Sequence, residues 1–86
     1  ASPELVALAG GPGPVAEAAQ KKAESAPLEA LHLAEAALAA EPKHRGALAA
    51  SLAAHRALRA GATNFWEVKW LEKEIARLGK ALGSAA

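Results

Sequence analysis

Three histidines are the side chains best suited to metal binding or acid–base chemistry, and their spacing favours neither. His32 and Glu35 lie on one predicted helix, but that helix carries no second histidine, and zinc usually needs three protein ligands. His55 falls within an apolar stripe, which predicts a core or interface histidine that is hydrogen-bonded to a neighbour. His44 falls at the start of a predicted helix. We therefore expect no metal site and no cofactor site in this chain.

Nucleophilic catalysis has equally little support from the hydroxyl side chains. Ser25 is predicted to be a turn residue and Ser51 a small packing residue, and neither follows a strand–turn–helix elbow. The chain contains no cysteine, which excludes thiolate nucleophiles and cysteine-ligated zinc. The glycines between positions 10 and 13 cannot form a phosphate cradle, because the prolines among them lack N–H donors. No catalytic residue is expected, and the chain is not expected to be an enzyme.

Arg45, Arg56 and Arg59 share one side of a predicted helix and are the best argument for nucleic-acid contact. The charged side chains of the preceding predicted helix are all acidic: Glu29, Glu35 and Glu41. Arginines that face Glu29 and Glu35, or a partner chain, explain the pattern equally well. Ten Lys and Arg against nine Asp and Glu give a net charge of +1. We expect neither a nucleic-acid partner nor a membrane partner.

Two tryptophans give a sharper signal of binding. At 100° per residue, Trp66 and Trp70 lie about 40° apart and about 120° or more from the centre of an apolar stripe on the same predicted helix. That stripe consists of Val68, Leu71, Ile75, Leu78 and Leu82. Tryptophans off the core face need another surface, which is either a partner or the two short helices that begin the chain.

Proline, glycine and capping residues divide the chain into five helical segments. The predicted segments run from Pro3, after a Ser2 cap, to Gly10; from Pro14 to about Ser25; from Pro27 to Glu41; from about Lys43 to Gly61; and from an Asn64 cap to about Leu82. No segment alternates with period two, so strands are not expected. The sequence predicts an all-α fold of four to five short antiparallel helices in one domain over residues 1–86. Residues 10–14 are expected to form a hinge-like turn and residues 83–86 a frayed tail.

Small side chains dominate the faces along which these helices are expected to pack. Hydrophobic residues make up 52% of the chain but aromatic residues only 3%, so the core is thin and a partner surface is expected. Two stripes are flanked by alanines and predict closely packed neighbours: Leu28, Leu31, Ala34 and Leu38, then Leu48, Leu52, His55 and Leu58. The first residue is alanine, which predicts a fragment of a larger protein. We expect a cytoplasmic location, while an exported parent protein stays open.

Two resemblances to known families are visible. Ala30, Ala37 and Pro42 are spaced like the small residues and terminal proline in the second helix of a tetratricopeptide repeat. Most of the chain, from about residue 4 to residue 80, resembles the alkyl sulfatase dimerisation domain, a helical domain that follows the catalytic domain of metallo-β-lactamase-fold hydrolases. The segments that carry this resemblance are residues 5–11, 30–35 and 38–42, the long fourth helix, Asn64-Phe65 and residues 70–75.

This second resemblance implies a domain that packs two subunits of a zinc-dependent hydrolase together and helps to wall its active site. The zinc would belong to the parent's catalytic domain, whose histidine motif is absent from this sequence. We therefore expect a non-catalytic dimerisation or accessory domain whose partners are a second copy and the parent catalytic domain. The candidate interface residues are Trp66, Trp70, Leu48, Leu52, His55 and Leu58. The alternative is a tetratricopeptide-like adaptor that binds an extended peptide in a groove between helices.

Overall fold

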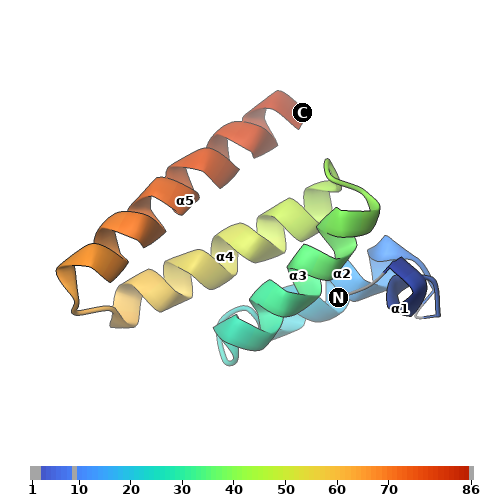
Figure 1. Ribbon diagram of the computed structural model, residues 1–86, viewed down its shortest axis with the longest axis horizontal. Helices are drawn as coiled ribbons and strands as arrows, with labels where there is room; N and C mark the ends of the chain where they lie inside the picture. The colour runs from blue at the N-terminus through green and yellow to red at the C-terminus, as the bar shows by residue number, and fades with distance from the viewer. Residues whose placement is uncertain (1–2, 9, 86) are drawn as a thin grey trace.

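A computed structural model describes residues 3–8 and 10–85, and these residues form five α-helices and no strand. The helices are α1 (Pro3–Leu8), α2 (Pro12–Lys22), α3 (Pro27–Ala40), α4 (Arg45–Gly61) and α5 (Phe65–Ala85) (Figure 1). The all-α prediction is confirmed. The predicted cap Ser2 and the last residue of the predicted tail, Ala86, lie outside the described residues.

Helices α2, α3 and α4 pack against one another through alanine faces. Ala19 of α2, Ala34 of α3 and Ala50 of α4 form one buried cluster, in which no side chain extends beyond a methyl group. Because alanine adds so little bulk, the three helix axes approach closely and few large side chains are needed to fill the space between them. This arrangement explains how a chain with a thin core forms a packed three-helix unit.

The short helix α1 lies across the ends of α2 and α3. Val6 is buried against Val15 and Ala16 of α2 and against Ala37 of α3. The helix ends in a Schellman arrangement, in which Gly10 N–H donates to Ala7 and Gly11 N–H donates to Val6. Val6 of α1 is thus covered by its two neighbours, whereas Leu8 is 85% exposed. The tryptophans of the last helix do not cover α1, so that alternative for Trp66 and Trp70 is wrong.

Helix α5 packs along α4 on the side away from α2 (Figure 1). Its predicted apolar stripe faces inward, with Leu71 and Leu78 the largest fully buried side chains of the described residues. Leu78 packs against Leu48 and Leu52 of α4, and Leu38 of α3 contacts the same cluster. Burial of each such leucine stabilises the fold by about 1.5–3 kcal/mol, so this seam holds α5 in place.

Several predicted boundaries differ from the structure: α2 ends at Lys22 and not at about Ser25, and α4 begins at Arg45 and not at about Lys43. The hinge-like turn over residues 10–14 is shorter than predicted, because α2 begins at Pro12. Gly10 and Gly11 make the turn with φ angles of 98° and 101°, and the prolines fit the first helical turn, where their missing N–H groups have no helical acceptor. At the other end, α5 continues past Leu82 to Ala85. Arg45 donates to the Leu82 carbonyl at 3.1 Å and so satisfies a group near the helix end.

Candidate functional site

Three large aromatic side chains at the start of α5 are exposed and form what we call the aromatic patch: Phe65, Trp66 and Trp70. Their exposed fractions are 62%, 77% and 54%. Asn64 fixes this first turn, because its side-chain oxygen accepts hydrogen bonds from the N–H groups of Trp66 at 2.9 Å and Glu67 at 3.1 Å. The predicted Asn64 cap is confirmed. The patch therefore stands on an ordered helix start.

Contacts among the rings and their neighbours orient the aromatic patch. Phe65 and Trp66 meet edge to face, with ring centroids 5.3 Å apart. The Lys69 ammonium lies 5.7 Å from the centroid of the Phe65 ring. The other side of the patch is anchored to α4, since the rings of Trp70 and His55 lie 5.7 Å apart. Phe65 is absent from the interface predicted from sequence. Its position next to Trp66 in the first turn of the helix is the feature that could have identified it.

The remaining predicted interface residues lie inside the molecule. Leu48, Leu52 and His55 have exposed fractions of 5%, 9% and 5%, and Leu58 is half-buried against the cluster around Leu31 and Ala54. Other helices of the same chain already cover these four predicted interface residues: α5 packs on Leu48, Leu52 and His55, and the cluster that includes Leu31 of α3 packs on Leu58. The hydrophobic period locates a buried face, but it does not say whether the covering helix belongs to the same chain or to another.

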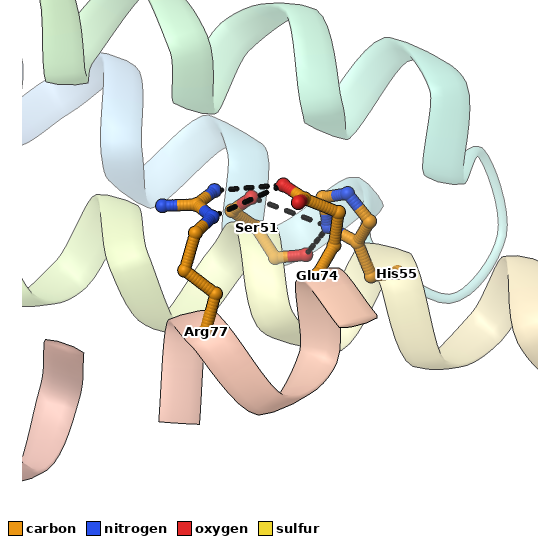
Figure 2. Close-up of polar contacts among 4 residues, drawn as sticks. All are labelled: Ser51, His55, Glu74 and Arg77. Atoms are coloured by element: carbon orange, nitrogen blue, oxygen red, sulfur yellow. Dashed lines mark hydrogen bonds and ion pairs between the residues drawn. The ribbon is translucent and has the colours of Figure 1, made fainter. Parts of the chain in front are cut away.

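Ser51, His55 and Glu74 lie close together and carry the residue types of a hydrolytic triad (Figure 2). His55 Nδ1 lies 2.7 Å from the Ser51 carbonyl oxygen, which can only accept, so this nitrogen carries the proton. The Ser51 hydroxyl lies 3.4 Å from the same nitrogen. A protonated Nδ1 cannot take the serine proton, so this geometry does not activate Ser51 as a nucleophile. His55 is a hydrogen-bonded core histidine, as predicted.

The carboxylate of Glu74 is engaged by Arg77 rather than by His55. Arg77 donates from Nη2 at 2.9 Å and from Nε at 3.2 Å (Figure 2). These hydrogen bonds are the main reason that the pKa of Glu74 lies below its ordinary value of 4.5. Burial opposes the shift in this pKa, while the positive charges of Arg77, His55 and Lys73 reinforce it. Glu74 is therefore a carboxylate held in its ionised form, which suits an ion pair and not a general acid.

The other two histidines take separate positions. His44 is the cap of α4, and its Nδ1 accepts a hydrogen bond from the Ala47 N–H at 3.1 Å, as expected for a residue at a helix start. His32 borders a shallow hollow of about 290 Å³ together with Lys22, Glu29 and Leu33. Across residues 3–8 and 10–85, no group of three or more His, Asp and Glu side chains is placed to hold a metal ion.

The arginines of α4 have partners other than those predicted. Arg59 pairs with Glu72 of α5 at 3.2 Å, and Arg45 bonds the end of the same helix. Glu29 pairs instead with Lys22 of α2 at 3.1 Å. The expected pairing of these arginines with acids of α3 is therefore wrong for Arg59 and Glu29, because α5 covers the side of α4 that carries Arg59.

No helix in the described part of the chain is long and apolar enough to cross a membrane. Comparison of the sequence with protein-family models and with curated proteins, and of the structure with solved structures, gives no match. The argument for function therefore starts from the aromatic patch itself.

Proposed function

We propose that this chain is a non-catalytic dimerisation domain and that two copies meet at the aromatic patch. The observation that carries the proposal is the exposure of Phe65, Trp66 and Trp70 together on an ordered helix start. Large aromatic anchors that are already held in one orientation lose little entropy on binding. They are also the residues most enriched among the energetic centres of protein interfaces.

A second copy is the partner favoured by the resemblance to the alkyl sulfatase dimerisation domain. In a two-fold dimer the same patch faces itself, so Trp66 and Trp70 of each copy would meet their counterparts. The α5 helices would cross near their starts, because the later part of α5 carries Lys73, Arg77 and Lys80, which repel the same residues of a parallel neighbour. The same resemblance makes the catalytic domain of a zinc-dependent hydrolase the proposed neighbour in a larger parent protein.

Sedimentation of the purified chain tests this proposal. We expect a dimer at high micromolar concentration, and we expect the double variant Trp66→Ala, Trp70→Ala to be a monomer with unchanged helix content by circular dichroism. Leu28→Ala is the matched control, because Leu28 is 63% exposed on α3, and it should stay dimeric. A folded monomeric wild type at that concentration, or equal weakening by the control, would overturn the proposal.

The alternative function, a tetratricopeptide-like adaptor, has less support from the structure. An extended peptide needs a groove that runs across several helices, whereas the hollow near His32 is bordered by four residues from α2 and α3. Two of those residues, Lys22 and Glu29, already pair with each other. The aromatic patch lies on α5, which this hollow does not reach.

A further inference from the structure

The outward side of α5 carries a row of cations that we call the basic face: Lys69, Lys73, Arg77 and Lys80. At 100° per residue, the other three lie within about 40° of Lys73 around the helix. All four side chains are exposed. The apolar stripe of α5 points the opposite way, into the seam with α4, and Figure 1 shows that α4 covers one side of this helix.

The acidic residues of α5 lie away from the basic face. Glu67, Glu72 and Glu74 are each about 100° or more from Lys73 around the helix. Glu72 is directed to Arg59 of α4. Glu74 is paired with Arg77, whose cation consequently contributes less than the three lysines. The basic face therefore presents positive charge with carboxylates confined to its flanks.

This charge is local and does not reflect the composition of the whole chain. The net charge of the chain is +1, so the four cations of the basic face are balanced by acids elsewhere on the molecule. Because the net charge is small and the cations of α5 lie on one face, an anionic surface attracts that face of the molecule more strongly than the others.

We propose that the basic face docks on the surface of a bilayer that contains anionic phospholipids. The basic face is one convex row of cations on a single helix. Lipid headgroups are mobile and lie in a plane, so they can contact such a row without a groove in the protein. This inference goes beyond dimerisation, since the charge that it uses comes from the basic face and not from Phe65, Trp66 and Trp70 of the dimer contact.

A lipid surface fits the geometry of α5 better than a nucleic acid does. A helix in a duplex groove has phosphates on both sides, and here those sides carry Glu72, Glu74 and the helix α4. Stacking of single-stranded bases needs open ring faces, whereas Lys69 lies over the Phe65 ring and Phe65 meets Trp66 edge to face. A flat anionic surface can contact the basic face while Glu72 and Glu74, at its sides, stay in water.

Vesicle binding followed by tryptophan emission tests the proposal on the intact chain. Both tryptophans, Trp66 and Trp70, border the basic face, so their emission reports on this site. We expect binding to phosphatidylcholine vesicles that contain about one third phosphatidylserine, little binding to pure phosphatidylcholine, and loss of binding at high salt. The double variant Lys73→Gln, Lys80→Gln should lower the partition coefficient at least about tenfold at low salt, since each cation near such a surface contributes about fivefold.

The matched control removes the same charge from exposed lysines elsewhere, as Lys21→Gln, Lys43→Gln. It should retain most of the binding, and equal loss in both double variants would overturn the assignment to the basic face. Absence of binding to the anionic vesicles at low salt would overturn it as well, as would tighter binding to a single-stranded oligothymidine than to vesicles. Sedimentation separates the two proposals, because the double variant Lys73→Gln, Lys80→Gln leaves the contacts of the aromatic patch intact and should still dimerise.

Discussion

Glu74 has the least exposed side chain among the ion-paired residues of the described chain, with 19% of its surface accessible. It lies beside His55, and its hydrogen bonds come from Arg77, one turn further along the same helix. Sequence periodicity places Glu74 at the edge of the seam between α4 and α5, but it does not reveal that Arg77 holds the carboxylate. The residue types Ser51, His55 and Glu74 alone suggest a catalytic triad. The hydrogen bonds that they form do not support one, because Glu74 is bound by Arg77.

The lowered pKa of Glu74 predicts a pH-dependent contribution to stability. A carboxyl whose pKa is lower in the folded state stabilises the fold above its unfolded pKa, and this contribution is lost as the pH falls through the folded value. Between about pH 6 and about pH 3, the melting temperature of the wild type should therefore fall further than that of Glu74→Gln. Arg77→Gln removes the main cause of the shift and should flatten the pH dependence in the same way. Full wild-type dependence in Arg77→Gln would contradict this account.

At the scale of the helix, start and stop signals are the part of the fold that local sequence predicts well. Pro27, Asn64 and the Gly10 stop act where they were expected to, because each sets backbone geometry or a hydrogen bond within a few residues. The start of α2 at Pro12 differs from the predicted Pro14, since the two prolines are equivalent local signals. The end of α5 lies beyond the predicted Leu82 because Arg45, which is distant in sequence, binds its last turn.

Gly79 offers a test of helix propensity in the middle of α5. It is exposed, and a Cβ atom added there would meet nothing within 4 Å outside its own helix backbone and chain neighbours. Gly79→Ala should stabilise the chain by about 0.5–1 kcal/mol, since alanine loses less backbone entropy in a helix. Thermal unfolding should show a rise in the melting temperature of about 2–8 °C. Gly10→Ala is the opposite control, because Gly10 has φ of +98° and an alanine there is strained, so its melting temperature should fall.

At the scale of the whole molecule, the sequence predicts which face of each helix is buried but not which helix covers it. The apolar stripe of α4 predicts a partner surface, but Leu78 and its neighbours on α5 cover Leu48 and Leu52, and Leu58 packs against the cluster around Leu31. Amphipathic period is a property of one helix, whereas the choice of neighbour depends on all the faces available. The tryptophans were placed correctly off the core because their angle to the stripe follows from helix geometry alone.

The arrangement of the five helices predicts that α5 is the first long helix to open. Helices α2, α3 and α4 contact one another, while α5 rests on α4 with one side chain, Leu38, reaching it from α3. Local opening costs less where fewer buried contacts are broken, so amides of α5 should exchange with deuterium faster than those of α3 and α4. Leu78→Ala should accelerate exchange in α5 more than in α3, because it removes about 2–5 kcal/mol of packing from this seam. Equal protection of α5 and α3 in the wild type, with equal acceleration in the variant, would instead show that the five helices unfold as one cooperative unit.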